Sequence, residues 1–455
     1  MSLISKQTTG SAKERYVYLT ETPINRLIPS LAVPTIISML VTGIYNSADT
    51  FFVGRISTQA TAAVGLVFSV MAVIQAFGFF CGQGSGTYLS RMMGAGNLQR
   101  ANEMSATGFA VSLIIGVVIA VLGNVFATPM AKALGATPTT MRDTLIYMRI
   151  ILIGAPFMTG QFVLNNQLRY QGSAFYSMIG LLTGAILNIA LDPLLMFVFH
   201  LGVAGAALAT ISGQLISFIV LFAGTRKGGN VRPELKNVRL NWYYIRELIN
   251  GGAPSLFRQG LAAVATMLLN QAAGTYGGDA AIAAMSVVTR AVMLIVSALI
   301  GFGQGFQPVA GFNLGAGKKA RVREGFFFCV KYGTIFLVLG AVFCIVFAPQ
   351  VIGFFRNDPD VIQVGTVALR AQAIVLPLLG FTMMSNMLLQ SIGEGVKASI
   401  TSAARSGIFF IPLILILPRL FGLFGVEITQ ACADVLATAL AIPLVAGQIR
   451  KLKDE

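Results

Sequence analysis

Apolar runs separated by short polar breaks recur from one end of this chain to the other. Twelve of them are long enough to cross the hydrocarbon core of a bilayer as a helix, which takes about 20 residues. The pattern therefore predicts an all-α polytopic membrane protein with twelve transmembrane helices. These are expected near residues 28–53, 58–88, 103–127, 141–168, 174–199, 203–224, 243–273, 279–311, 325–347, 361–390, 396–418 and 424–448.

The composition supports a membrane protein and argues against an enzyme. Of the 455 residues, 55% are hydrophobic and only 11% are charged, whereas soluble domains carry about a quarter charged residues. The single histidine, His200, makes a histidine-based metal site or catalytic relay improbable. A membrane-embedded prenyl transferase would need clustered aspartates of the DDxxD kind, and the chain has no such cluster. We therefore expect no catalytic residues and no cofactor.

The positive charges indicate a topology. The net charge is +15, and the basic residues gather on alternate breaks between the apolar runs, above all on 225–242. Because basic residues favour the cytoplasmic side of a membrane, this asymmetry predicts that both termini are cytoplasmic. The expected location is the cytoplasmic (inner) cell membrane, with a cytoplasmic segment at 1–27 and a cytoplasmic tail at 449–455. The basic excess thus reflects topology, and we expect no nucleic-acid partner.

The chain also repeats itself at a nearly constant spacing. Because six helices separate equivalent positions, the two halves are expected to insert in the same orientation, related by a pseudo-two-fold axis along the membrane normal. The predicted units are an N-lobe at 28–224, a basic linker at 225–242 and a C-lobe at 243–448. The matching pairs are Pro34 and Pro254, Gln83 and Gln304, the "GAG" runs at 94–96 and 315–317, Pro156 and Pro377, Asn165 and Asn386, Gly172 and Gly393, and the "GV" pairs at 202–203 and 425–426.

Polar side chains inside the apolar runs mark a candidate site in the N-lobe. Asn188 and Asp192 are four residues apart and share one helix face, and Thr210 lies at a similar depth on the returning helix. Asp49 lies near the outer end of the first helix, so all four can reach one layer. A carboxylate at such depth costs roughly 2.5–3.5 kcal/mol and is rarely idle. The alternative is that Asp192–Pro193 only breaks a helix and Asp49 only caps one.

Two carboxylates with amide and hydroxyl oxygens are suited to Na⁺, and the same carboxyl groups can instead hold a proton. The sequence therefore predicts a cation or proton site formed by Asp49, Asn188, Asp192 and Thr210, with Na⁺ as the metal if transport is coupled to sodium.

The C-lobe carries weaker candidates for a polar or substrate site. Arg290 interrupts an apolar run and is expected to face the bundle or a water-filled cavity, either as a structural partner or as a substrate ligand. Asn270 lies where the repeat places Asp49, and Asp434 lies beside the position equivalent to Thr210. Gln304 is the repeat partner of Gln83. Because most N-lobe site positions map to neutral residues, the cation site is expected in the N-lobe only.

Several motifs resemble those of the multidrug and toxic compound extrusion (MATE) family, in particular its DinF- and MepA-like bacterial branch. They are "ADTFFVGRISTQATAAVGL" at 48–66, "GAG" at 94–96 and "GVAGAALAT" at 202–210. The resemblance covers essentially the whole chain and includes the plan of two lobes with six helices each. Position by position, the family's N-lobe cation site matches Asp49, Asn188, Asp192 and Thr210.

The resemblance implies a secondary active antiporter that works by alternating access. Its substrates would be organic, amphipathic and cationic compounds, exported from a monomer in the lipid bilayer in exchange for Na⁺ or H⁺. One departure is that residues 251–270 carry no acidic side chain, whereas another branch of the family has one in this helix. The alternative is a lipid-linked saccharide flippase of the same superfamily, and Arg258 with Arg290 leaves this open.

Overall fold

The computed structural model describes residues 11–452, apart from the side chains of residues 43–50. The described chain is a succession of helices joined by short connections. In order they are α2 (Ala12–Glu21), α3 (Ile24–Gly54), α4 (Thr58–Gly94), α5 (Leu98–Val125), α6 (Ala127–Ala133), α7 (Met141–Ile153), α8 (Ala155–Tyr170), α9 (Ala174–Pro193), η1 (Leu194–Val198), α10 (Gly202–Gly224), η2 (Leu235–Asn237), α11 (Trp242–Gly315), α12 (Lys319–Val346), α13 (Ala348–Phe355), α14 (Pro359–Val375), α15 (Leu378–Ser391), α16 (Gly395–Ala403), η3 (Ala404–Ile408), α17 (Phe410–Phe421) and α18 (Leu423–Lys451).

Twelve membrane crossings follow from these helices, as the sequence predicts. Within the described residues, nine helical segments are long and apolar enough to span a membrane. Two further pairs pass the same test together, α7 with α8 and α14 with α15, bent by 49° and 58°. The remaining crossing comes from α11, whose 74 residues would reach about 110 Å at ~1.5 Å per residue. At Gly278 its backbone leaves the helical region (φ 64°, ψ −160°), so α11 forms two arms.

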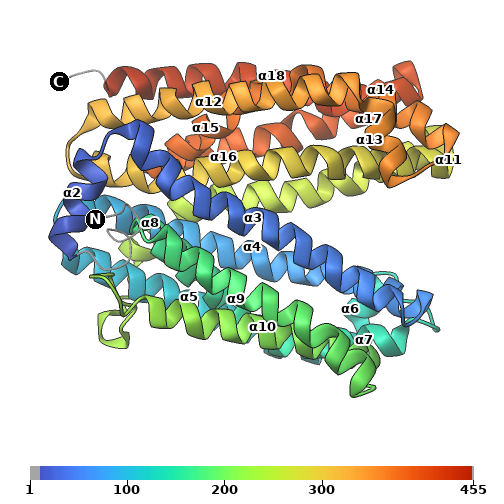
Figure 1. Ribbon diagram of the computed structural model, residues 1–455, viewed down its shortest axis with the longest axis horizontal. Coiled ribbons are helices and arrows are strands. Elements are labelled where there is room, and N and C mark those ends of the chain that lie inside the picture. Colours follow the sequence, from blue (N-terminus) through green and yellow to red (C-terminus); the bar gives the residue numbers. More distant parts are fainter. Residues whose placement is uncertain (1–10, 453–455) are drawn as a thin grey trace.

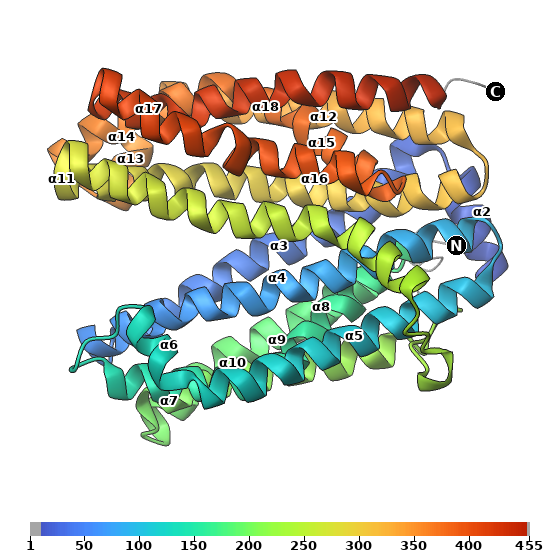
Figure 2. The same ribbon diagram turned by 180° about the vertical axis from the view of Figure 1, so that it is seen from behind.

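The helices form two groups that lie side by side. Figures 1 and 2 show α3 to α10 in one group and α11 to α18 in the other, with α3 passing between them. Helix α2 and the C-terminal end of α18 lie at the same end of the molecule in both views, called here the α2 end. Away from this end the two groups diverge (Figure 2). This is the expected two-lobe architecture.

The two "GAG" motifs cross each other at the α2 end. A methyl group added at Gly94 would lie 2.0 Å from the carbonyl oxygen of Phe312, and one added at Gly315 would lie 2.0 Å from that of Arg91. The repeat offset that relates Gly94 to Gly315 also relates Arg91 to Phe312. The two contacts are therefore copies of one another, as a pseudo-two-fold axis at this crossing requires. Only glycine permits backbones to approach this closely.

Hydrogen bonds join the two helix groups near the same crossing. Arg169, fully buried on α8, donates to the side-chain oxygen of Gln304 on α11. Arg91 on α4 donates to the carbonyl oxygen of Ser391 at 3.1 Å and forms an ion pair with Glu247 at 3.2 Å. All the hydrogen bonds between the two groups that the structure describes lie in this half of the molecule. The protein is thus closed at the α2 end.

Helix α2 straps this closed end. The buried Arg15 donates to the side chain of Asn230 and to the carbonyl oxygen of Gly228, both in the segment that follows the first group. On the other side, Asn313 donates to the carbonyl oxygen of Leu19 at 3.0 Å. Burial lowers the pKa of Arg15 to about 10, which still leaves its guanidinium charged at neutral pH. Helix α2 is therefore held by the linker on one side and by α11 on the other.

Candidate cation site and cavity

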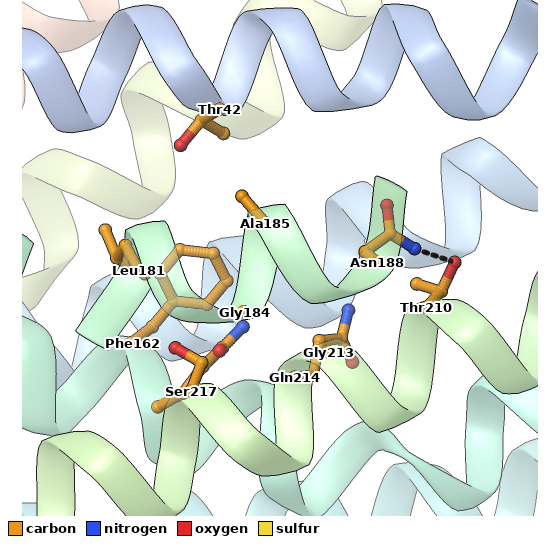
Figure 3. A pocket seen from close by; sticks show the side chains of 11 residues that line it. Thr42, Phe162, Leu181, Gly184, Ala185, Asn188, Thr210, Gly213, Gln214 and Ser217 are labelled. Carbon is orange, nitrogen blue, oxygen red and sulfur yellow. Dashed lines mark hydrogen bonds between the residues drawn. The ribbon is translucent and has the colours of Figure 1, made fainter. Parts of the chain in front are cut away.

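The candidate site in the first helix group begins where α9 and α10 approach most closely. A methyl group added at Gly184 would lie 2.6 Å from the carbonyl oxygen of Gly213, and one at Gly213 would lie 2.7 Å from that of Gly184. Because neither glycine carries a side chain, the helices can pack closely enough for Asn188 to reach Thr210. The Asn188 Nδ2 donates to Thr210 Oγ1 at 3.5 Å (Figure 3). Thr210 Oγ1 in turn donates to the carbonyl oxygen of Ala206 at 3.0 Å.

The side-chain oxygen of Asn188 is the chemically informative atom of this pair. Asn188 is 3% exposed, and its Oδ1 accepts no hydrogen bond from any residue that the structure describes. A buried acceptor left without a donor costs about 1–3 kcal/mol. A cation or a proton donor placed beside Oδ1 would remove that cost. The atom is therefore available as a ligand.

Asp192 lies one helical turn beyond Asn188 on the same face of α9 and is fully buried. The helix type changes directly after Asp192. Pro193 ends the α-helical part, and residues Leu194–Val198 continue as a π-helical turn. Since proline cannot donate the backbone hydrogen bond expected at its position, it accounts for this local change. Such turns occur frequently at functional sites.

The fourth predicted ligand, Asp49, belongs to α3, but its side chain lies outside the described residues. The structure thus brings Asn188 and Thr210 into contact and places Asp192 beside them. Helix α3 does reach the site elsewhere, since Thr42 lines the adjoining cavity.

This cavity lies between α3, α8, α9 and α10, with a volume of about 40 Å³ accessible to water-sized molecules. That volume accommodates an ion with water, whereas drug-sized ligands occupy sites of roughly 300–1,000 Å³. A larger substrate would require these helices to separate. The cavity is lined by Thr42, Gln161, Phe162, Leu181, Gly184, Ala185, Asn188, Thr210, Gly213, Gln214 and Ser217 (Figure 3).

Sequence reasoning missed Gln161, Gln214 and Ser217 as cavity residues. Gln214 and Ser217 follow Thr210 at helical spacing on the same face of α10, so their periodicity was a usable signal. Gln161 lies on α8, and nothing in its local sequence connects it to α9 or α10. Elsewhere, no group of three His, Cys, Asp or Glu side chains in the described residues is placed to hold a metal ion.

The weaker candidates are dispersed in the second helix group. Gln304 is buried and accepts from Arg169, Asn270 is half-buried, and Arg290 is exposed on α11. Arg290 was expected to face either the packed bundle or a water-filled cavity. Its exposure shows that it does not lie in the packed interior. Arg258 is half-buried on the first arm of α11.

Asp434 on α18 is fully buried and forms an ion pair with Arg405, whose Nε lies 2.7 Å from its Oδ1. Sequence reasoning had not singled out Arg405. Its signal was the same as that of Arg290, a single charge inside an apolar run.

Two groups of six crossings, joined at one end and related by a repeat, define a membrane transport protein built from parallel repeats. A buried polar site between helices of one group fits that class. The chain belongs to the MatE family. The family model matches it twice, at residues 34–194 and 254–416, so the two matches begin at the repeated prolines Pro34 and Pro254.

Relatives of known name cover nearly the whole chain. It is 30% identical over 437 residues to the multidrug export protein MepA of Staphylococcus haemolyticus, covering 95% of each chain. It is 29% identical over 438 residues to MepA of Staphylococcus aureus, covering 95% of this chain and 96% of the relative. These similarities place the chain in the MepA-like branch of the family, as predicted.

Solved structures agree with the fold. A MOP superfamily transporter from Pyrococcus furiosus, described as having a binding pocket of reversed polarity that suggests a different function, matches with a TM-score of 0.88 and 25% identity, covering 100% of this chain and 99% of that one. A MATE protein in complex with MaL6 matches with a TM-score of 0.88 and 26% identity over the same shares of the two chains.

Proposed function

We propose that this protein is a secondary active antiporter that exports amphipathic organic cations in exchange for Na⁺ or H⁺. The observation that carries the proposal is the buried, unpartnered Oδ1 of Asn188 one turn from the buried carboxylate of Asp192. A cation that enters the site would be coordinated by this oxygen and attracted by the Asp192 carboxylate. The MepA relatives, which are multidrug export proteins, support drugs as the exported compounds.

The proposed cycle is alternating access, in which the coupling ion and the substrate exclude one another. The conformation in which the α2 end is closed is one of the two alternating states. By the positive-inside rule this end is cytoplasmic, because it carries the basic segment 225–242. The described state then faces outward across the cytoplasmic membrane. The ion must bind one state more tightly than the other, since a ligand with equal affinity for both shifts no equilibrium.

In this state the coupling ion enters the small N-lobe cavity and contacts Asp192, Asn188 and Thr210, with Asp49 as the expected fourth ligand. Binding draws α3, α9 and α10 together and favours release of the substrate. The flippase alternative has less support, since the MepA relatives are export proteins. We expect the protein to act as a monomer.

The proposal is tested by efflux of a fluorescent organic cation from proteoliposomes containing the purified protein. Na⁺ and pH gradients are imposed separately. We expect one of the two gradients to accelerate efflux at least tenfold over liposomes without a gradient. Acceleration by neither gradient, with the protein correctly inserted, would contradict ion-coupled antiport. A protein that instead rescues an envelope-precursor defect would support the flippase.

A further inference from the structure

The second helix group contains an ion pair, Arg405 with Asp434, in which three of the five polar side-chain atoms make no hydrogen bond to the described residues. Asp434 Oδ1 accepts from Arg405 Nε at 2.7 Å and from Gln430 Nε2 at 2.9 Å. Asp434 is fully buried, and its Oδ2 accepts no hydrogen bond from the residues that the structure describes. The carboxylate thus holds the guanidinium at one nitrogen only.

The terminal nitrogens of Arg405 remain available. The side chain of Arg405 is 24% exposed, and neither Nη1 nor Nη2 donates a hydrogen bond to, or is buried unpaired among, the described residues. A guanidinium has five N–H donors in a planar fork, so four remain here. The bond from Nε anchors one side of the guanidinium, and the edge formed by Nη1 and Nη2 stays open. A fork of this kind binds a carboxylate through two parallel hydrogen bonds.

The backbone around Arg405 departs from the regular α-helix. Arg405 lies in the π-helical turn η3 (Ala404–Ile408), which interrupts the crossing formed by α16 and α17. The repeat relates this position to the region of Gly184, and it relates Asp434 to the region of Ile211. Gly184 lines the cavity of the first group, and Ile211 follows Thr210 there. The second group therefore places a charged pair where the first group has its cavity.

A second acidic side chain lies on α18, the helix that carries Asp434. Glu427 on α18 is two turns before Asp434 and on the same face, on the order of 10 Å away at ~1.5 Å per residue. Its side chain is 7% exposed, and no hydrogen bond or ion pair joins its carboxyl group to the described residues. A buried carboxylate in a membrane helix is a functional candidate by its cost alone.

We propose that Arg405 is a specificity-determining residue that binds the carboxylate of zwitterionic amphipathic substrates, while Glu427 attracts their cationic group. The inference rests on the proposed export function and narrows its substrate class. Asp434 acts as a positioning residue that orients the guanidinium without touching the substrate. A permanently cationic compound would interact with Glu427 alone and gain nothing from Arg405.

The test compares two dyes that differ by one charge, rhodamine B, which carries a free carboxylate, and its ethyl ester, which does not. Arg405→Gln is expected to reduce efflux of rhodamine B from proteoliposomes by about tenfold, which corresponds to ~1.4 kcal/mol. Efflux of the ester should remain within about twofold of the wild type. Glu427→Gln should reduce efflux of both dyes, since each carries a cationic group.

A double variant without either charge distinguishes loss of substrate binding from misfolding. Arg405→Gln alone leaves Asp434 as an unpaired buried charge, which is strongly destabilising, whereas Arg405→Gln with Asp434→Asn removes both charges. The double variant should show the same selective loss of rhodamine B. An equal loss of both dyes in the double variant, or no loss of either, would overturn the inference.

Binding to the detergent-solubilised protein separates this inference from the proposed function. Rhodamine B fluorescence anisotropy should show binding that weakens about tenfold in Arg405→Gln, whether or not the protein transports the dye. Arg405-dependent binding without ion-driven transport would contradict the proposed export function and leave the inference standing. Transport of the ester with neither binding nor transport of rhodamine B would overturn the inference and leave the export function standing.

Discussion

Replacing Asp192 by Asn is expected to abolish ion-driven efflux while leaving the protein folded and inserted. The change preserves the size of a fully buried side chain and removes only its charge and one acceptor. The ion would then lose a charged ligand, and a neutral water molecule in the small cavity would not replace that charge. We expect the ion-driven rate to fall by at least ~100-fold, equivalent to ~2.7 kcal/mol, as measured by efflux from proteoliposomes under the gradient that drives the wild type.

The matched control is Asp279→Asn, the same chemical change at an exposed position on α11. It should leave transport within about twofold of the wild type, because a surface charge contributes little. Asn188→Ala should give an intermediate loss, since it removes one neutral ligand atom. Undiminished ion-driven efflux in Asp192→Asn would rule out Asp192 as a ligand of the coupling ion.

The crossings were predictable from the sequence because their lengths are set by the bilayer, but their shapes were not. The run at 141–168 reads as one helix, yet the chain bends by 49° between α7 and α8. Pro156 follows that bend and Pro377 lies at the corresponding bend of the second group, so a proline signal existed. How far a proline bends a helix depends on which neighbours satisfy the freed carbonyl groups, and those neighbours are remote in sequence.

Asn188 and Asp192 could be predicted as site residues from the local sequence alone. Their four-residue spacing places them on one helix face, and a carboxylate in an apolar run is costly to bury. The contact of Asn188 with Thr210 was predictable because a short loop sets two helices antiparallel at matched depth. Gln161 and Arg405 were harder because their partners come from helices far along the chain. The ion pair between Arg405 and Asp434 spans 29 residues and a π-helical turn, and local spacing does not encode it.

Gly94→Ala is expected to open the closed end of the molecule. The added methyl group would lie 2.0 Å from the carbonyl oxygen of Phe312, whereas ordinary contact begins near 3.4 Å, so α4 and α11 must separate. Overpacking of this kind costs typically about 1–3 kcal/mol. The cost falls on the state in which the two helices touch, and the equilibrium should shift toward the state open at the α2 end. We expect net transport to fall roughly 10-fold or more.

A single reporter cysteine measures the shift directly. Ser90, fully buried beside the crossing, is changed to Cys after the native cysteines are replaced, and its labelling by a polar maleimide is followed. Labelling should accelerate in Gly94→Ala. The control is Gly65→Ala on the same helix, where an added methyl group meets nothing within 4 Å. Since alanine is the better helix former, Gly65→Ala should be neutral or slightly stabilising.

The sequence repeat adds a second variant that should behave in the same way as Gly94→Ala. Because Gly315 meets the carbonyl oxygen of Arg91 at the same 2.0 Å, Gly315→Ala should reproduce the defect of Gly94→Ala. Its own control is Gly260→Ala on α11, where an added methyl group again meets nothing within 4 Å. A defect in only one of the two crossing variants would show that the closed end does not follow the pseudo-two-fold axis. If both crossing variants behave like their controls, the two helices do not form the closure on which outward-facing access depends.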